Sequence, residues 1–340
     1  MAVNAPAFAL VHPSFMEPGL ILPYAQASGA FDTVAGQGPM VKLSEDDLYV
    51  YARRVDIRTI TASGQAAYNM LPSVQVAFSM ISTPTYQIRT RAEFDHHDTA
   101  AVARWGTSIN EMYRLGHRQA HVQLARTALL YGFNPANGEG LVNANGATLA
   151  TLPADSNGNT TVVTYDNGQL AVWIIGQIQA MKTRTNQLGI PQRFSILGPQ
   201  RVLGQMEYSN IVQLVQFQRD GAGTETTAGV IKNILERNKD EILWLYDDTL
   251  IGKGAGGTDA VLLTMPEVKK PNGGKMNTNT FAELAPGLEA CTAIYADMAA
   301  PREIPTPMPG GAIDVLFEQR ITSGWALRGE CVTVMSMQYQ

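Results

Sequence analysis

The stretch Ala103–Phe133 constrains the fold of this chain most, because it has the pattern of one long, uninterrupted helix. Ser108 and Glu111 stand in the register of a capping box at its start, and Asn134-Pro135 ends it. Apolar or small side chains recur at steps of three and four residues: Ile109, Met112, Leu115 with Gly116, Ala120, Leu124, Ala128 and Tyr131. Such a helix would be about 40 Å long. We therefore expect a sheet or another chain to lie along its narrow apolar stripe.

Composition predicts a folded chain that buries surface against copies of itself. The 340 residues are 45% hydrophobic, which suffices for a sizeable core and suggests two domains or one elaborated domain. Only 16% of the residues are charged, against a usual quarter. The net charge of −5 argues against tight nucleic-acid binding, which needs clustered Lys and Arg, but it allows a protein that encloses nucleic acid.

The cysteines and the N-terminus favour a protein that stays inside the cell. Cys291 and Cys331 lack CxxC spacing, so we expect small buried thiols, with a disulfide as the minor alternative. No run reaches the ~18 apolar residues of a membrane helix. The N-terminal residues lack the basic region of a signal peptide.

Two segments before the long helix are expected to pack on something outside themselves. Residues 1–48 contain five prolines and no sustained period, yet they are too apolar for a solvated tail. They predict an extended arm, held by a neighbouring subunit or wrapped on its own domain. Apolar and polar side chains alternate over Val55–Ile60, Val74–Met80 and Tyr86–Phe94, with Ser82-Thr83-Pro84 as a break between the last two. This alternation predicts a long loop of strands with one apolar face.

The part after the long helix alternates helix-like and strand-like segments. Helices are expected at Leu170–Gln187, Pro199–Tyr208 and Ala228–Arg237, and strands at Arg193–Leu197, Ile242–Tyr246 and Ala260–Met265. Ile211–Phe217 and Leu288–Met298 fit either a strand or a short helix. Dense proline and glycine between Pro301 and Gly311 predict a crossing between domains, and Ala312–Met337 is strand-like.

Neither histidine pair makes a convincing metal site. On a strand, the adjacent His96 and His97 point to opposite faces and cannot bind one ion together. His117 and His121 lie four apart on one helical face, which suits a metal, but they lack the glutamate of an HExxH motif. Both pairs fit exposed or interface positions better.

The remaining motifs also predict no catalytic, cofactor-binding or metal-binding residues and no cofactor. Gly252–Gly257 resembles a phosphate-binding loop, but no helix start follows it, so we expect a flexible loop. Asp46-Asp47 and Asp247-Asp248 lack a partner motif and are expected to face solvent. Neither GxSxG nor GxxxxGK[ST] occurs. An α/β enzyme that uses the glycine loop or the histidines is the competing class.

The order of these segments resembles the major capsid protein family of tailed bacteriophages, whose HK-ninety-seven-like fold is shared with encapsulins. Three local features carry the resemblance, which covers most of residues 50–337. The helix runs through Arg126–Phe133 into Asn134-Pro135 and Gly140-Leu141-Val142-Asn143. Met265-Pro266-Glu267 is followed by an extended run, and Val315–Arg320 is followed by Gly324–Arg328.

The resemblance implies an α+β fold of four parts: an N-terminal arm (1–50), an extended β-loop (51–100), a peripheral domain with a long spine helix (101–150 and 306–340), and an axial α/β domain (151–305). It implies a coat protein, not an enzyme, that self-assembles into hexamers and pentamers of an icosahedral virion shell around double-stranded DNA. The expected partners are other copies, portal and scaffolding proteins, and decoration proteins in phages that have them. Sequence-specific DNA binding and a membrane are not expected. The alternative is an encapsulin-like shell of a cellular nanocompartment.

Overall fold

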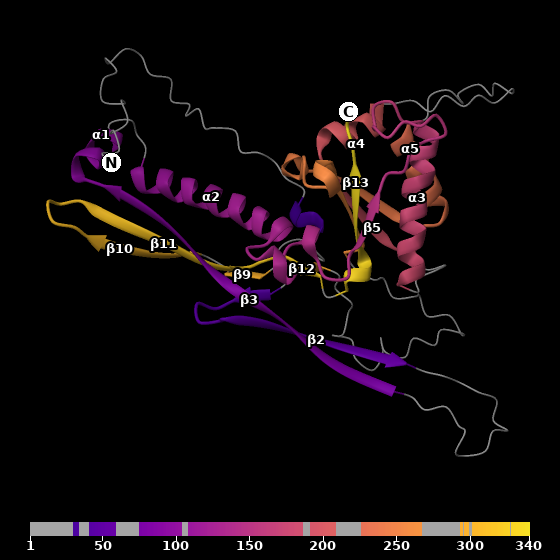
Figure 1. The fold of residues 1–340 in the computed structure, drawn as a ribbon. Helices are drawn as coiled ribbons and strands as arrows, with labels where there is room; N and C mark the ends of the chain where they lie inside the picture. Colours follow the sequence, from indigo (N-terminus) through magenta and orange to yellow (C-terminus); the bar gives the residue numbers. More distant parts are fainter. Residues whose placement is uncertain are drawn as a thin grey trace, which may run out of the picture. The chain divides into compact units, whose positions relative to one another are not determined.

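The computed structural model describes residues 30–33, 41–58, 75–103, 108–185, 191–208, 226–266, 293–294, 296–298, 301–326 and 328–340 (Figure 1). The described residues fall into two compact units. The first unit contains those of Gln87–Leu124 and Ala300–Gln319, and the second contains those of Ser28–Tyr86, Ala125–Ala299 and Arg320–Gln340. Three elements continue from one unit into the other: strand β3 (Gln75–Phe94), helix α2 (Ile109–Tyr131) and strand β11 (Ile313–Thr322).

The first unit packs α2 on one face of a three-stranded sheet. Strand β10 (Arg302–Pro307) pairs antiparallel with β11, and β11 lies next to β3. Along β3 the buried side chains alternate with exposed charged ones, as predicted for Tyr86–Phe94. The buried ones are Ile88, Ala92 and Phe94, and the exposed ones are Arg89, Arg91 and Glu93. A short helix, α1 (His96–Ala103), follows β3.

The proline-rich segment predicted as a domain crossing is structured. It forms β10 and the turn that joins β10 to β11, and the change of unit falls at its start, at Ala300. Pro305 and Pro307 are compatible with a strand because, among the described strands, β10 pairs with β11 alone and so has one open edge. Gly310 and Gly311 take φ values of 94° and 83° in the turn.

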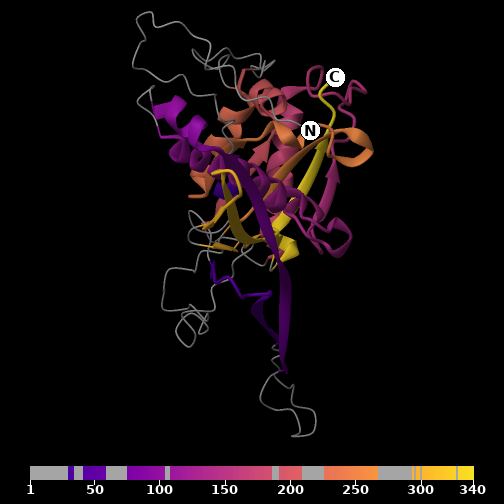
Figure 2. The same ribbon diagram turned by 90° about the vertical axis from the view of Figure 1, so that its left-hand side faces the viewer.

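The first half of β3 forms a two-stranded antiparallel ribbon with β2 (Tyr49–Arg58), as Figure 1 and Figure 2 show. This confirms the strands predicted for the extended loop. The predicted break at Ser82-Thr83-Pro84 is wrong, because β3 continues through it. Pro84 lies opposite Tyr49, the first residue of β2, so its missing N–H falls at the end of the pairing.

Four short strands also belong to the second unit. Strand β1 (Val41–Leu43) pairs parallel with β9 (Ala296–Met298), which also pairs with β11. Strand β12 (Trp325–Ala326) pairs antiparallel with β8 (Ala293–Ile294). The described part of Leu288–Met298 is therefore strand rather than helix, whereas Ile211–Phe217 lies outside the described residues.

The second unit is built on a five-stranded mixed sheet. Its order is β4 (Thr148–Thr151), β13 (Val332–Met337), β7 (Asp259–Thr264), β5 (Arg193–Gly198) and β6 (Glu241–Tyr246). Strand β13 runs parallel to β4 and antiparallel to β7. Every residue of β7 and β13 is buried, as in central strands covered on both faces. The three strands predicted between residues 193 and 265 are confirmed.

Three helices pack with this sheet: α3 (Asn167–Arg184), α4 (Gln200–Tyr208) and α5 (Thr227–Arg237). They confirm the three predicted helices to within three residues at each end. Helices and strands share one apolar core, which includes Ile174, Ile178, Leu203, Ile231, Phe194, Leu263 and Met335. Burial of this core is the main stabilising contribution to the second unit.

A buried ion pair fixes the end of α3. Lys182 Nζ lies 2.8 Å from Asp240 Oδ2, and both side chains are almost fully buried. The same carboxylate accepts a hydrogen bond of 2.8 Å from the backbone N–H of Gln192, just before β5. Removing either partner would leave an uncompensated buried charge.

The long helix is shorter than the predicted Ala103–Phe133. Helix α2 has 23 residues, about 35 Å. Ala103 is the last residue of α1, and residues 104–107 lie outside the described part of the chain. The carbonyl of Ser108 accepts the N–H of Met112, which confirms Ser108 at the start of the helix. Gly132 has a φ of 70°, so the helical geometry ends there.

A close backbone contact closes the C-terminal end of α2. The N–H of Gly140 donates to the carbonyl of Gly324 (2.8 Å), and the N–H of Gly324 donates to the carbonyl of Ala128 (3.1 Å). A Cβ at position 324 would lie 2.3 Å from the carbonyl oxygen of Leu129. Residue 324 must therefore be glycine for the chain to approach α2 this closely.

The buried side chain of Glu139 stabilises this contact between the end of α2 and Gly324. It is buried and accepts hydrogen bonds from Tyr86 Oη (2.7 Å), the N–H of Asn134 (3.0 Å) and Ser323 Oγ (2.8 Å). Burial, followed by the hydrogen bond and charge of Glu139, raises the pKa of Tyr86 to about 12, so this phenol stays a donor at neutral pH. We call Glu139, Gly140, Ser323 and Gly324 the helix-end clasp.

Two expectations from composition can be compared with the described residues. Cys331 is buried and free, as expected, whereas Cys291 lies outside the described part. Among the described helices, none combines the length and the apolar content needed to cross a membrane.

We expect Gly324→Ala to lower the free energy of unfolding by about 1–3 kcal/mol, because the new methyl group overlaps the backbone of α2. Gly176→Ala is the matched control: Gly176 is an exposed residue of helix α3, where a Cβ meets no atom within 4 Å. That change should stabilise the protein by about 0.5–1 kcal/mol. Urea unfolding followed by circular dichroism measures both. Equal stability of the two variants would contradict the clasp.

Candidate assembly surface

Five large apolar side chains share one face of the β2–β3 ribbon. In an antiparallel pair, directly opposed residues and residues two apart along a strand point to the same face. Tyr51 lies opposite Ser82, and steps of two along β3 lead from Ser82 to Met80, Phe78 and Val76. The surface formed by Tyr49, Tyr51, Val76, Phe78 and Met80 is called the ribbon face below.

The ribbon face is uncovered among the described residues. Its exposed fractions range from 47% for Val76 to 80% for Phe78. The rings of Tyr49 and Tyr51 lie 6.3 Å apart, between centroids, and so add to a continuous aromatic surface. A two-stranded ribbon is marginally stable by itself, and a contiguous exposed apolar patch typically marks an interaction site. The arrangement suits contact with another protein surface.

Helix α2 carries a smaller exposed apolar stripe. Met112, Leu115 and Val122 are 43%, 48% and 58% exposed and are spaced by three and seven residues, which places them on one side of the helix. The neighbouring Tyr113 instead stacks on Phe94 of β3, with 5.7 Å between ring centroids. In the first unit, therefore, one side of α2 faces the sheet and another side is open.

The sequence-based interpretation of His117 and His121 as exposed or contact positions is wrong for the described residues. They are 8% and 4% exposed and lie on the side of α2 that faces the sheet. Both rings lie within hydrogen-bonding distance of Thr90 Oγ1 on β3, and His117 stacks on Phe317 of β11 at 3.8 Å between centroids. Burial is the largest cause that lowers the pKa of each histidine.

His96 and His97 start helix α1, so their predicted position on a strand is also wrong. Asp95 and Asp98 exchange backbone-to-carboxylate hydrogen bonds of 2.8 and 3.2 Å across the first turn, and this capping box starts the helix. The two histidine rings are exposed and lie 3.9 Å apart. Within the described ranges no group of three or more His, Cys, Asp or Glu side chains is placed to hold a metal ion.

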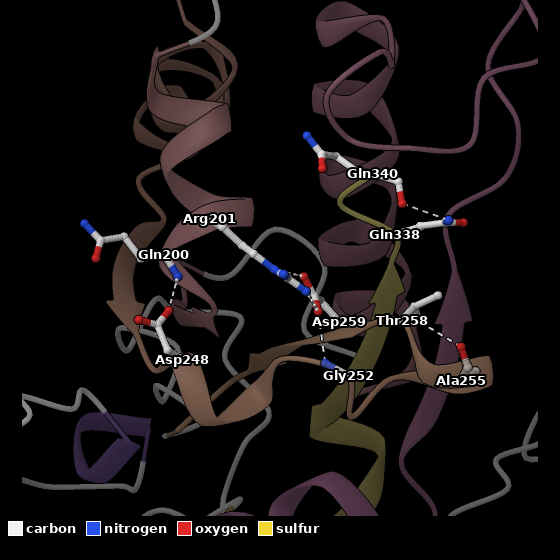
Figure 3. Close-up of polar contacts among 9 residues, drawn as sticks. All are labelled: Gln200, Arg201, Asp248, Gly252, Ala255, Thr258, Asp259, Gln338 and Gln340. Atoms are coloured by element: carbon white, nitrogen blue, oxygen red, sulfur yellow. Dashed lines mark hydrogen bonds and ion pairs between the residues drawn. The ribbon is translucent and has the colours of Figure 1, made fainter.

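The loop Gly252–Gly257 has no α-helix after it, in agreement with the sequence. It contains a 3-10 turn, Ala255–Gly257, and then enters β7. Hydrogen bonds connect the residues of this loop, and its flexibility stays a prediction. The N–H of Gly254 donates to the carbonyl of Thr258. Thr258 Oγ1 donates to the carbonyl of Ala255, as drawn in Figure 3.

The hydrogen-bond donors that could bind an anion at this loop are bonded to a buried carboxylate instead. Asp259 is 1% exposed and accepts the N–H of Gly252 at 3.0 Å. Its two oxygens also bind the Arg201 guanidinium at 2.7 and 2.5 Å (Figure 3). Because the nearby donors are satisfied and the carboxylate repels anions, the loop is unsuited to a phosphate group.

The two predicted acidic pairs differ in their surroundings. Asp46 and Asp47 are exposed, as expected. Asp248 is exposed as well, and its carboxylate accepts the N–H of Gln200 at the start of α4 (Figure 3). Asp247 is buried and accepts the N–H of Thr249 at 2.9 Å, so its predicted exposure is wrong. The carboxylates of Asp47, Asp247 and Asp248 each cap a local turn or helix.

Sequence reasoning found one strand of the ribbon face and only the end of the other. The strand predicted at Val55–Ile60 overlaps the end of β2 but does not reach Tyr49 and Tyr51. The alternation over Val74–Met80 indicated one apolar face. Tyr49 and Tyr51 carry the same two-residue spacing, but the spacing is too short by itself to assign a strand. Register, which the structure supplies, is what joins the two sets of side chains.

No protein-family model matches the chain, and no curated protein matches it in sequence. Solved structures do match it over nearly its whole length. The capsid of Myoviridae phage XM1 has a TM-score of 0.65 and 10% identity, and the match covers 99% of this chain and 100% of that one.

Two further matches agree with the first. The capsid of a native GTA particle has a TM-score of 0.60, 12% identity and 99% coverage of each chain. A structure from Mycobacterium phage Che8 has a TM-score of 0.55, 12% identity, and coverage of 95% of this chain and 96% of that one. Identities this low establish a common fold alone. The chain therefore has the α+β, HK-ninety-seven-like fold of these capsid structures, as the resemblance implied.

Proposed function

We propose that this chain is the major capsid protein of a tailed bacteriophage. Copies of it would assemble into hexamers and pentamers and form an icosahedral shell around packaged double-stranded DNA. The observation that carries the proposal is the fold match to the XM1 capsid, which spans 99% of this chain and 100% of the other. A match end to end leaves little of either chain to serve a different architecture.

The ribbon face supports the same proposal on physical grounds. Its five side chains are about half to four-fifths exposed, and covering them would contribute roughly 25 cal/mol for each Å² of apolar surface. In a closed shell each copy supplies one ribbon and receives another. Many modest contacts of this kind add up to a stable particle.

We propose the following assignment of parts: residues 1–50 as the arm, 51–100 as the extended loop, 101–150 and 306–340 as the peripheral domain, and 151–305 as the axial domain. One amendment is supported by strand pairing. Strand β13 lies between β4 and β7 in the sheet of the second unit, which favours placing Val332–Met337 with the axial domain. The arm lies largely outside the described residues.

The same proposal includes the partners and the location. Copies of the chain would be the principal partner, joined by portal, scaffolding and, where present, decoration proteins. The protein would be assembled in the host cytoplasm and reside in the virion capsid. It would enclose DNA without reading its sequence, consistent with a net charge of −5. It would not be an enzyme and would have no cofactor, no catalytic residues and no metal-binding residues.

An encapsulin-like compartment is the alternative within the same fold. A phage capsid gene is expected beside portal, terminase and tail genes, and phage particles purified from infected cells would contain DNA. A compartment protein would lack those neighbours and enclose another protein.

Electron micrographs of the purified full chain test the proposal directly. We expect closed shells, or rings of five and six subunits, because the ribbon face requires a covering surface. A protein that stays monomeric in micrographs and in light scattering, at concentrations of tens of micromolar and with the portal and scaffolding proteins co-expressed, would contradict the proposal.

We expect the double variant Phe78→Ser, Met80→Ser to abolish or strongly weaken assembly while leaving the folded subunit intact. Both side chains are more than 60% exposed, so the substitutions remove little packing within the chain. Ala77→Ser is the matched control, one residue away on the opposite face of β3. Sedimentation velocity measures the assembled fraction, and thermal unfolding checks the fold. Assembly of the double variant at the control's level would remove the ribbon face from the interface.

A further inference from the structure

Two buried histidines on α2 share a single hydroxyl group. His117 Nδ1 lies 2.5 Å from Thr90 Oγ1, and His121 Nε2 lies 3.3 Å from the same oxygen. The other nitrogens, His117 Nε2 and His121 Nδ1, are buried and have no hydrogen-bond partner in the structure. The first unit therefore holds two ionisable rings with incomplete hydrogen bonding where its helix meets its sheet.

Proton counting shows which charge state fits this arrangement. A hydroxyl has one proton to donate, so one neutral ring can accept from Thr90 while the other donates to it. In that state only one of the two outer nitrogens carries a hydrogen. When both rings are protonated, both outer nitrogens carry a hydrogen and a share of positive charge. Among the described residues His117 Nε2 then has no acceptor, and Gln319 is the polar side chain that can accept from His121. The buried site thus suits neutral histidines.

The charged groups around the site do not compensate for two protonated rings. On α2, Arg114 adds positive charge nearby, but it is held by Glu303 of β10 at 2.8 Å. Glu303 raises the pKa of His117, although less than burial and His121 lower it. Burial lowers the pKa of His121, and a hydrogen bond with the side chain of Gln319 on β11 raises it by less.

The other charged residues of this sheet point away from the site. Arg89 and Arg91 alternate with Thr90 along β3 and so lie on the opposite face. There they pair with Glu318 and Asp314 of β11 at 2.7 and 2.8 Å. Those carboxylates are consequently not available to the histidines. Arg118 on α2 is exposed.

We propose that His117, His121 and Thr90 form an acid-sensitive latch between α2 and the sheet of the first unit. At neutral pH the rings are uncharged, and the helix stays packed on β3 and β11. In acid both rings take up protons, and this unit loosens before the second unit does. The inference concerns the subunit itself and stands whether or not the chain forms a shell.

The direction of the pH dependence follows from the lowered pKa values of both histidines. A ring whose pKa is lower in the folded state than in the unfolded chain stabilises the fold while it is neutral. That contribution is complete above the unfolded pKa of about 6.5 and is lost as the pH falls from there toward the folded pKa. Each histidine changes the folding equilibrium by up to about tenfold per pH unit in this window.

Hydrogen–deuterium exchange of the full chain tests the latch. After correction for the intrinsic exchange rate, we expect peptides from Gln87–Phe94 and Ile109–Leu124 to exchange at least tenfold faster at pH 5.5 than at pH 7.5. Peptides from α3 in the second unit should change less than twofold. Unchanged protection in the first unit, or earlier loss of protection in α3, would overturn the proposal.

Two double variants make the test specific. His117→Gln, His121→Gln should remove the acid response of the first unit, whereas His96→Gln, His97→Gln should retain it, because those rings are exposed. The fifth histidine, His12, is present in both variants, so its protonation contributes equally to the two exchange measurements. An acid response that survives the first pair of substitutions, or that disappears with the second, would refute the latch. If the first variant fails to fold, the exchange pattern of the unmodified chain decides.

Discussion

The close approach of Gly324 to the last turns of α2 is the contact on which the other connections of the fold depend. It brings the end of β11 onto the helix, with the backbone of Leu129 where a side chain would otherwise lie. Glu139 then joins a third element, because it binds Tyr86 of β3 as well as Ser323. These three elements, α2, β3 and β11, are the ones that continue into the first unit. Within the second unit, the clasp holds the residues of β3 and those after β11 against the last turns of α2.

The two faces of the first unit's sheet contribute differently to its stability. One face carries exposed ion pairs, such as Arg91 with Asp314, and solvent screens pairs of that kind so that they stabilise the fold little. The other face buries Ile88, Ala92 and Phe94 toward α2 and therefore provides most of the stabilisation. The buried histidines interrupt that apolar face. They make the packing of α2 dependent on pH at the place where the unit is otherwise held by apolar burial.

Periodic patterns predicted much of this fold. The strands and helices between residues 193 and 265 were found because their apolar runs are long and bounded by turn residues. The shorter α2 was missed because Gly132, with its positive φ, ends the helix before Phe133, and periodicity cannot register a single backbone angle. The burial of Asp247 and of the two histidines was also missed. Their partners, Thr249 excepted, come from segments far away in the sequence, and no local pattern reports such contacts.

The candidate surface was predicted in part for the same reason. Alternation along one strand indicated an apolar face, but the tyrosines of β2 join that face through strand register, which depends on pairing. No residue pattern indicated the clasp, because nothing in the sequence around Gly140 and Gly324 shows that their backbones are in contact. The resemblance to capsid proteins relied on the order of elements, and order is what the comparisons confirm at 10–12% identity.

The position of β13 in the sheet determines when the second unit can fold during synthesis. This strand lies between β4 and β7, so the sheet of the second unit cannot close until the ribosome has added Met337. Both strands of the ribbon, by contrast, have been synthesised once Phe94 has been added. Each nascent chain therefore exposes the apolar side chains of the ribbon face some 240 residues before the core of the second unit is complete. Incomplete chains that are made close together could associate through these side chains, and chaperones that bind exposed apolar segments would prevent it.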